Sequence, residues 1–233
     1  MLLEELRRQV LDANLEIVRQ GLVLYTFGNV SGIDRASGLV AIKPSGVDYA
    51  TMRPEDIVIT DLEGKVVEGK LRPSSDLATH LVFYKHFPSI GGVTHTHSEY
   101  ATAWAQARRP IPCLGTTHAD YFYGPVPVSQ DLTKQEIEED YELNTGLVVT
   151  RTVSAEAAAK VPAVLVAGHG PFTWGKSAME SAHHAAILEY VAKMASHCYA
   201  ANPAARELPA AQRDKHYERK HGANAYYGQP DKR

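Results

Sequence analysis

The spacing of apolar and polar positions predicts helices that alternate with short strands. Apolar residues from Leu3 to Ile17 recur every three or four positions, as on one face of a helix, which we expect to end near Gly21. The segments 22–27 and 39–42 are rich in β-branched and apolar residues, and we expect both to form strands.

The next segments predict a hairpin followed by a helix. The apolar runs 57–60 and 66–67 flank a turn at Glu63-Gly64, which is typical of a β-hairpin. A helix is expected to open at Ser74-Ser75-Asp76, after Pro73, and to end before Pro88.

The second half of the chain repeats this alternation. A strand is expected to hold His95 and His97, and a short helix follows over 101–107. The capping boxes 133–136 and 177–180 mark two helix starts, the second opening a long helix to about Ala201. With a last helix over 209–222, the pattern predicts one α/β domain over 1–233, with a central mixed sheet covered by helices.

Composition narrows the class of protein. The 233 residues carry a net charge of -3, and 44% are hydrophobic, so we expect no nucleic-acid or membrane partner. No apolar run is long enough for a membrane span, and the start of the chain does not resemble a signal peptide. Cys113 and Cys198 form no paired motif, which favours a reducing, cytoplasmic setting.

Two histidines two residues apart are the most informative chemical feature. In a strand, alternate side chains share a face, so His95 and His97 should point the same way. His169 follows an apolar strand in a Gly-His-Gly-Pro sequence, at a predicted sheet edge. Three histidines suit one divalent metal with an open position, although half-buried strand histidines without a metal give the same pattern.

Asp76 is a candidate fourth ligand. A carboxylate beside three histidines would give a mixed nitrogen and oxygen site for Zn²⁺ or a similar ion. An acidic residue in the first turn of a helix also serves as a cap, and Asp61 and Glu68 are nearby alternatives as ligands.

Three short segments could together form an anion cradle: Gly28-Asn29, Lys43 to Gly46, and Ser74-Ser75 at a helix start. Free amides, hydroxyl groups and a lysine bind phosphate well, but the same residues are also common in ordinary turns.

Two further segments carry candidate acid–base groups. Asp120, within a polar and aromatic stretch, could act as a general base, and His118 could be a ligand, an orienting partner or a core residue. Near the C-terminus, Tyr226 and Tyr227 follow a charged helix and need somewhere to bury, on this subunit or a neighbour.

The motifs occur in the order found in a known family. The segments that carry the resemblance are Gly28-Asn29-Val30-Ser31, Lys43-Pro44-Ser45-Gly46-Val47, Arg72-Pro73-Ser74-Ser75-Asp76, Thr94-His95-Thr96-His97, Gly115 to Tyr121, His169-Gly170-Pro171-Phe172, and Lys220-His221-Gly222 through Tyr226-Tyr227-Gly228-Gln229. Together they resemble the class II aldolase/adducin family over about residues 3–229, and the aspartate at position 76 points to its epimerase branch.

The resemblance implies roles for individual residues. It implies a metal site, with zinc the usual ion and manganese an alternative, held by Asp76, His95, His97 and His169. It implies substrate binding by Gly28, Asn29, Lys43, Ser45, Gly46, Ser74, Ser75 and His216. Asp120 and Tyr227 would be the acid–base pair, with the tail 226–233 reaching the site of a neighbouring subunit in a homotetramer.

The resemblance also implies an activity. It is the metal-dependent epimerisation at C4 of a ketopentose 5-phosphate, L-ribulose 5-phosphate to D-xylulose 5-phosphate, in arabinose or another pentose catabolism. The alternatives are a class II aldolase that cleaves a deoxyketose 1-phosphate, and a non-catalytic adducin-like interaction domain.

Overall fold

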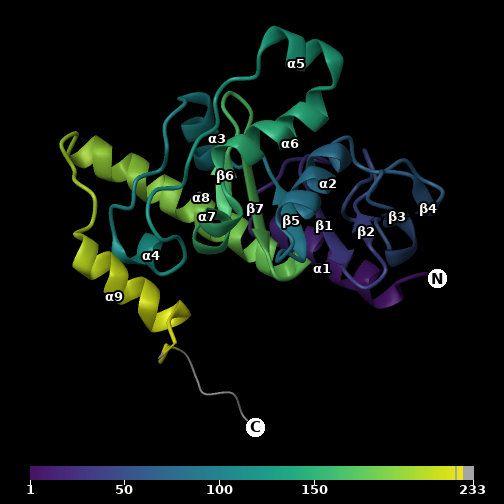
Figure 1. Cartoon of the computed structure of the whole chain (residues 1–233), viewed down its shortest axis with the longest axis horizontal. Coiled ribbons are helices and arrows are strands. Elements are labelled where there is room, and N and C mark those ends of the chain that lie inside the picture. The colour runs from purple at the N-terminus through teal and green to yellow at the C-terminus, as the bar shows by residue number, and fades with distance from the viewer. Residues whose placement is uncertain (224, 228–233) are drawn as a thin grey trace.

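One seven-stranded sheet runs through the protein, in the order β4-β3-β2-β1-β5-β7-β6 (Figure 1). The computed structural model describes residues 1–223 and 225–227, so the predictions for residues 228–233 lie outside the described part. The strands are β1 (Asn29–Asp34), β2 (Leu39–Ile42), β3 (Val58–Thr60), β4 (Val66–Glu68), β5 (Gly92–His95), β6 (Ala163–Leu165) and β7 (Pro171–Gly175).

All six strand pairs of this sheet are antiparallel, so the prediction of a mixed sheet was wrong in this respect. The physical reason lies in the connections. β1–β2, β3–β4 and β6–β7 are each joined by a short connection, and strands joined in this way run in opposite directions. The predicted hairpin around Glu63-Gly64 is confirmed as β3–β4.

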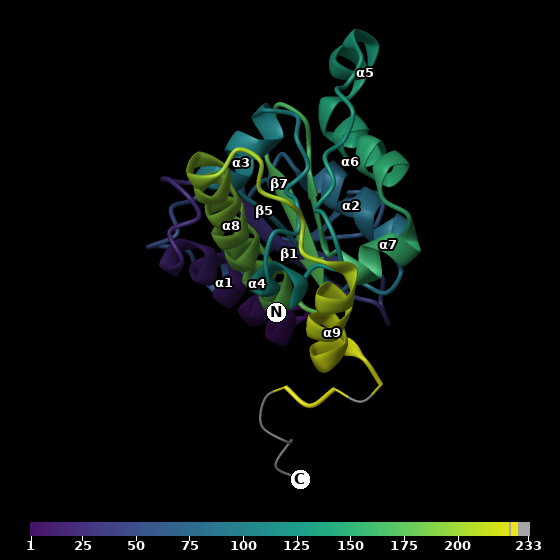
Figure 2. The same cartoon turned by 90° about the vertical axis from the view of Figure 1, so that its left-hand side faces the viewer.

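Helices cover both faces of the sheet. In Figure 2, α1 and α8 lie on one side, and α2, α6 and α7 on the other. The helices are α1 (Glu4–Arg19), α2 (Leu77–His86), α3 (Glu99–Gln106), α4 (Thr116–Ala119), α5 (Lys134–Glu139), α6 (Tyr141–Thr152), α7 (Ala155–Lys160), α8 (Ala178–Ala201) and α9 (Ala210–His221), with a 3-10 turn η1 (Pro54–Asp56). No helix in the described residues has both the length and the apolar character of a membrane span.

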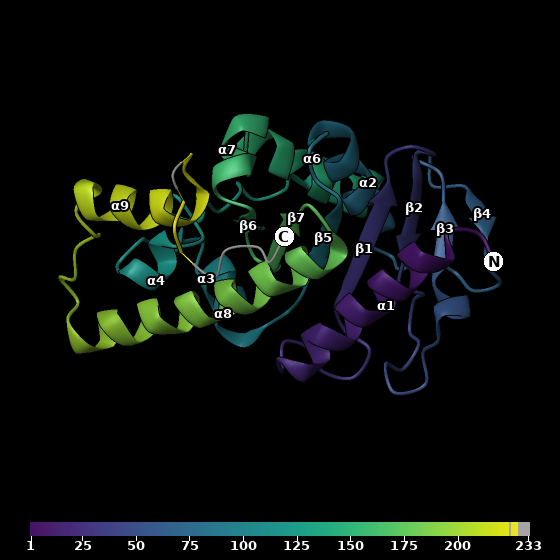
Figure 3. The same ribbon diagram turned by 90° about the horizontal axis from the view of Figure 1, so that it is seen from below.

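Successive residues along a strand face opposite sides of the sheet, and this alternation gives one hydrophobic core on each face. On β2, Val40 and Ile42 belong to the core under α2, whereas Ala41 between them belongs to the core under α1 and α8. The small residues Ala178, Ala182 and Ala185 let α8 pack closely on its side. Figure 3, seen from below, shows α8 and α1 crossing this face.

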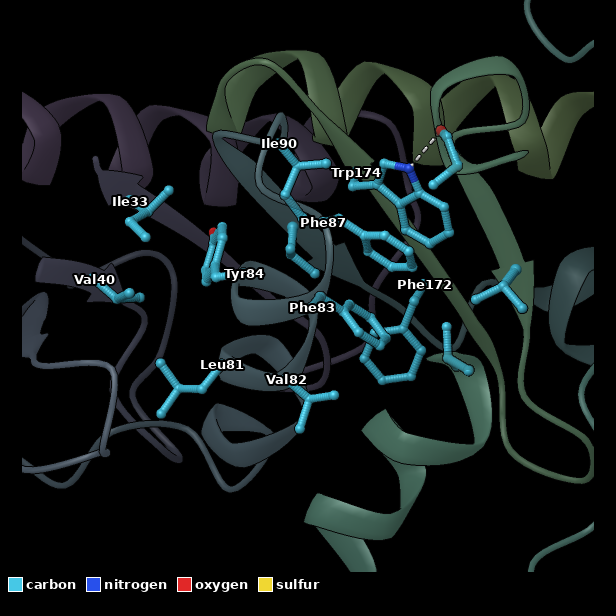
Figure 4. Packing of buried hydrophobic residues seen from close by; sticks show 14 of the residues in the cluster. Ile33, Val40, Leu81, Val82, Phe83, Tyr84, Phe87, Ile90, Phe172 and Trp174 are labelled. Carbon is cyan, nitrogen blue, oxygen red and sulfur yellow. Dashed lines mark hydrogen bonds between the residues drawn. The ribbon is translucent and has the colours of Figure 1, made fainter. Parts of the chain in front are cut away.

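An aromatic cluster fills the layer between the sheet and α2 (Figure 4). Phe83 of α2 and Phe87, the residue after this helix, contact Trp174 of β7 with ring centroids 6.0 and 5.3 Å apart. The Trp174 indole donates a hydrogen bond of 2.9 Å to the carbonyl of Ala158 in α7, which satisfies its buried N–H. This cluster fixes β7, and with it the turn that carries His169.

The segment 22–27 does not form the predicted strand, which corrects that prediction. The chain turns there instead, with positive φ angles at Tyr25 (51°) and Gly28 (72°). A Cβ on Gly28 would lie 3.0 Å from the carbonyl oxygen of His95, so glycine allows the chain to pass this close to β5. The strand begins one residue later, at Asn29.

Candidate active site

One cavity of about 410 Å³ gathers the residues predicted to bind a metal with those predicted to bind an anion. Its wall comes from β1, the segments that follow β2 and β5, the start of α2, the start of α6 and the β6–β7 turn. It is lined by Thr26, Phe27, Gly28, Asn29, Lys43, Pro44, Ser45, Gly46, Ser74, Ser75, Asp76, His95, His97, Tyr141, Glu142 and His169. Seven predicted substrate-binding residues and all four predicted metal ligands are in this wall.

Three histidines converge within the cavity. The candidate ligand atoms of His95, His97 and His169 all lie within 4.8 Å of one another. The Nε2 atoms of His95 and His97 are 3.0 Å apart, and the ring centroids of the three residues are 4.8 to 5.0 Å apart. This is the spacing of side chains that could share one divalent ion.

In two of these rings one nitrogen has a hydrogen-bond partner, which leaves the other nitrogen available. Nδ1 of His95 donates to the carbonyl of Pro171 at 2.9 Å, so its Nε2 keeps a lone pair facing His97. The hydroxyl of Tyr141 lies 3.3 Å from Nδ1 of His169. Outer partners of this kind orient metal-binding histidines, so the donor set fits a divalent metal.

The environment keeps the rings of His97 and His169 in the neutral form that binds metals. Burial, together with the neighbouring His95 and His97, lowers the pKa of His169 to about 3. Burial also lowers the pKa of His97, with a further contribution from His95. Protons therefore do not compete for the ring nitrogens of His97 and His169 near pH 7.

The structure differs in one detail from the predicted arrangement of the pair. β5 ends at His95, and His97 lies beyond it, before α3. Strand alternation therefore does not by itself account for their convergence. The stacking of His95 on Phe172, with centroids 4.2 Å apart, fixes the first ring, and the chain after the strand brings the second ring to it.

Asp76 lies at the start of α2, but its side chain makes no capping hydrogen bond. Instead, Asn29 donates from Nδ2 to Oδ2 of Asp76 at 2.6 Å. Burial would raise the pKa of this carboxyl, but His95, His80 and the bond from Asn29 outweigh it and hold the pKa below its usual range. Asp76 lines the cavity beside the three histidines and is not part of the group within 4.8 Å.

His80 is a buried residue beside this site that sequence reasoning missed. It lies one turn after Asp76 on α2, and its Nδ1 is 2.7 Å from the hydroxyl of Ser31, which in turn lies 2.7 Å from the hydroxyl of Tyr84. Its Nε2 has no hydrogen-bond partner among the described residues. Burial lowers the pKa of His80 to about 3. The i, i+4 spacing from Asp76 was the signal that could have identified it.

Backbone pairing assembles the anion-binding wall. Pro44 pairs with Pro73, the amide of Ser45 donates to Arg72, and the amide of Ser74 donates to Lys43. Two segments far apart in the sequence therefore form one rim. Lys43 is buried, and burial lowers the pKa of its amine to about 8, with Asp48 acting in the opposite direction. The amine remains mostly protonated at pH 7.

The candidate acid–base residues form a second cluster outside the cavity wall. Arg219 of α9 binds both carboxylate oxygens of Asp120, and Nδ1 of His216 lies 3.1 Å from one of them. The guanidinium of Arg219 also lies over the ring of Tyr227, 4.9 Å from its centroid. The wall of the metal cavity includes none of these four residues.

His118 serves the local fold. Its Nε2 donates to the carbonyl of Gly124 at 2.7 Å, and burial lowers its pKa to about 4. Of the roles open to it from the sequence, the structure supports the core residue. Tyr141, Glu142 and Arg219 were not predicted as site residues, since no motif distinguishes them from ordinary helix positions.

Comparisons with known proteins show the family of this chain. Residues 8–196 match the family model "Class II Aldolase and Adducin N-terminal domain". The chain is 53% identical over 227 residues to "L-ribulose-5-phosphate 4-epimerase UlaF" of Salmonella paratyphi B, covering 97% of this chain and 100% of the relative. The protein of the same name in Salmonella typhi is 52% identical over the same share of both chains.

Two solved structures have a fold similar to that of this chain. An "L-fuculose 1-phosphate aldolase" superposes with a TM-score of 0.75 and 29% identity, covering 92% of this chain and 95% of that one. The l-fuculose-1-phosphate aldolase of Thermus thermophilus gives a TM-score of 0.68 and 25% identity, over 86% and 98% of the two chains. The chain therefore belongs to the class II aldolase and adducin family.

Proposed function

We propose that this protein is an enzyme that epimerises C4 of a ketopentose 5-phosphate, converting L-ribulose 5-phosphate to D-xylulose 5-phosphate. The observation that carries the proposal is the cavity in which a histidine triad lies beside a phosphate-type cradle. The 53% identity to a relative named L-ribulose-5-phosphate 4-epimerase, over its full length, supports the same reaction.

The chemistry of this reaction requires both the histidine triad and the phosphate-type cradle. The proton on C4 is not acidified by the carbonyl at C2, so deprotonation there cannot invert the centre. Cleavage of the C3–C4 bond is feasible, because the electron pair left at C3 delocalises onto the C2 carbonyl as an enediolate. Re-formation of that bond on the opposite face of the aldehyde fragment gives the C4 epimer.

We propose zinc as the ion, with manganese as an alternative, held by His95, His97 and His169 with Asp76 beside them. A divalent ion there would supply Lewis-acid stabilisation of the negative charge that develops when the bond breaks. The residues themselves contribute the neutral donor set, and Asp76 adds a carboxylate that is held ionised.

The cradle would hold the phosphate of the departing aldehyde fragment. Lys43 supplies positive charge, Gly28, Gly46 and the backbone around them allow close approach, and Ser45, Ser74 and Ser75 supply hydroxyl groups. A fragment held at its phosphate end can rotate its aldehyde group and remain bound. His216 is proposed to contact the substrate from the second cluster.

Epimerisation also requires a base for one C4 hydroxyl and an acid for the other. We propose Asp120 and Tyr227 for these roles. Neither residue lines the metal cavity of its own chain, so each cavity would receive them from a neighbouring copy of the chain. We therefore propose a homo-oligomer, a tetramer by analogy with the family, with the sites between subunits.

Incubation of the purified protein with L-ribulose 5-phosphate, with and without a chelator, tests the proposal. We expect conversion to D-xylulose 5-phosphate that the chelator abolishes and added zinc restores. Product analysis with L-fuculose 1-phosphate is the control for an aldolase, because that reaction releases two fragments. Cleavage of this substrate without epimerisation of the other would replace our proposal by the aldolase alternative.

A further inference from the structure

His80 is a fully buried histidine beside the metal cavity, and one of its ring nitrogens has no partner. Its side chain is 0% exposed, and Nε2 is one of four buried side-chain atoms that lack a hydrogen bond in the described part of the chain. A buried polar atom without a partner costs free energy, so such atoms are rare in folded proteins. An apolar side chain would avoid this cost, and the presence of a histidine therefore needs an explanation.

The other ring nitrogen is held in place by two buried hydroxyl groups. Nδ1 of His80 lies 2.7 Å from the hydroxyl of Ser31, which lies 2.7 Å from the hydroxyl of Tyr84. The ring of His80 also meets Phe172 edge-on, with centroids 6.1 Å apart, and Phe172 stacks on His95. These contacts fix the orientation of the His80 ring.

The hydrogen bonds and a nearby charge favour a proton on Nε2. Burial lowers the pKa of His80 to about 3, so the ring is neutral and carries a single N–H. The hydroxyl of Ser31 can accept from Tyr84 and donate to Nδ1 of His80, which leaves the ring proton on Nε2. The negative charge of Asp76 acts on His80 and favours the same tautomer, because an N–H is more stable near a carboxylate than a lone pair is.

Asp76 is the acceptor that this N–H can reach. It lies one turn before His80 at the start of α2, where side chains four residues apart are neighbours, and the amide of His80 donates to its backbone carbonyl at 3.1 Å. Asn29 donates to Oδ2 of Asp76 at 2.6 Å, and no other hydrogen bond reaches this carboxylate within residues 1–223 and 225–227. The carboxylate is therefore free to accept a second bond.

We infer that His80 is a positioning residue for the metal centre: by donating from Nε2 to the carboxylate of Asp76, it orients that carboxylate toward the histidine triad. The bond forms when the carboxylate turns about its terminal torsion angle, which is soft. Asn29 then holds the carboxylate from β1 and His80 holds it from α2. The inference rests on the proposed function, since it concerns the metal centre of that proposal.

A double-mutant cycle on zinc affinity tests whether His80 acts through Asp76. The full-length proteins are wild type, His80→Phe, Asp76→Ala and the double variant, and competition with a chromogenic chelator measures their affinity for zinc. Phenylalanine keeps a ring against Phe172 and removes both nitrogens.

We expect His80→Phe to weaken zinc binding about 10–100-fold in the wild-type background, as loss of an outer partner of a ligand does. In the Asp76→Ala background the same change should alter the affinity less than about twofold, because its target is gone. An equal loss in both backgrounds would assign a purely structural role to His80 and overturn the inference.

A conservative variant tests the N–H itself. His80→Gln places an amide N–H near the position of Nε2, and we expect it to restore most of the zinc affinity that His80→Phe loses. The matched control is Thr60→Val, which removes another buried polar atom without a partner, on β3 and outside the cavity wall. It should bind zinc as the wild type does. Glutamine that binds zinc no better than phenylalanine would contradict the role of the donor.

Ser31→Ala tests the role if His80→Phe does not fold. It removes the hydroxyl that holds Nδ1 and leaves both His80 and Asp76 in place. We expect weaker zinc binding than in the wild type, and no further loss when the change is made in Asp76→Ala. A zinc affinity of Ser31→Ala equal to that of the wild type would overturn the inference.

This inference and the proposed function can fail separately, because zinc affinity is measured without turnover. If the wild type shows the coupling between His80 and Asp76 but does not epimerise L-ribulose 5-phosphate, the proposed reaction is wrong and the role of His80 stands. If epimerisation occurs and His80→Phe binds zinc as tightly as the wild type, the role of His80 is wrong and the proposed function stands.

Discussion

Arg219 donates two hydrogen bonds to the carboxylate of Asp120, from Nε to Oδ1 at 3.0 Å and from Nη2 to Oδ2 at 2.7 Å. Burial alone would raise the pKa of Asp120, but the bonds from Arg219 and His216 outweigh it and hold the pKa below its usual range. The pair joins α9 to the segment after α4. It therefore connects the C-terminal helix to the rest of the fold and keeps the candidate base ionised.

This pair should make stability depend on pH in a defined direction. A carboxyl whose pKa is depressed in the folded state stabilises the fold above its unfolded pKa, and this contribution is lost as the pH falls through the folded value. The free energy of unfolding of wild type should therefore exceed that of Arg219→Gln most at pH 6–7, and the difference should close towards pH 3. Urea unfolding at a series of pH values measures it. A difference independent of pH would assign the effect to packing.

Tyr227→Phe tests the proposed acid. Loss of one acid–base group typically costs on the order of 10²–10⁴ in turnover, and we expect kcat for epimerisation to fall in that range. Zinc content and oligomer mass should be unchanged, because the hydroxyl is not a predicted ligand. Tyr190→Phe, at a 59% exposed position on α8, is the matched control. Near-normal turnover of Tyr227→Phe would exclude the role.

Tyr141→Phe tests the outer partner of a metal ligand. The hydroxyl lies 3.3 Å from Nδ1 of His169, and removal of such partners typically lowers metal affinity about 10–100-fold. Competition with a chromogenic zinc chelator measures this directly, without relying on turnover. If the affinity of Tyr141→Phe equals that of wild type, the hydroxyl has another task in the cavity, such as contact with substrate.

Lys43 should limit substrate binding at high pH. Because the pKa of its amine is lowered to about 8, the cation that would attract phosphate is lost as the pH rises through that value. KM of the wild type for the sugar phosphate should rise above pH 8. KM of Lys43→Met should be high and should not change with pH over the same range. Bound phosphate would raise the pKa of the amine, so the effect should appear in kcat/KM, which reports on the free enzyme. A flat wild-type profile would contradict this role.

The elements with local signals were predictable from the sequence. The capping boxes at Thr133 and Ser177 each open a helix, and the 3–4 spacing after Leu3 gives α1. The segment 22–27 has strand-like composition, but its conformation is set by contacts with Tyr49 and Lys43, which local patterns do not report. Local patterns also do not report the relative direction of paired strands, which is why the sheet was predicted to be mixed and not antiparallel.

The candidate site residues also divide into those with a local sequence signal and those without one. Candidate residues in short motifs, such as His95, Ser74 and Lys43, were predicted from the sequence, and they line one cavity. Arg219, Tyr141 and His80 were missed, because their importance comes from what faces them in three dimensions. Only the fold shows that Arg219 meets Asp120 and that Asp120 is absent from the wall of its own cavity.

The pairing of β5 with β7 has a consequence for how such sites diversify. His95 is aligned with Phe172, and His169 lies in the turn that precedes β7, so the register of two adjacent strands sets the spacing of these rings. The long connection from β5 to β6, which runs from α3 through α7, can therefore lengthen or shorten over evolutionary time without moving the histidines. A slip of one residue between the strands would turn His95 to the opposite face and abolish the triad. Natural variation should accordingly tolerate insertions in that connection and reject them within the strands.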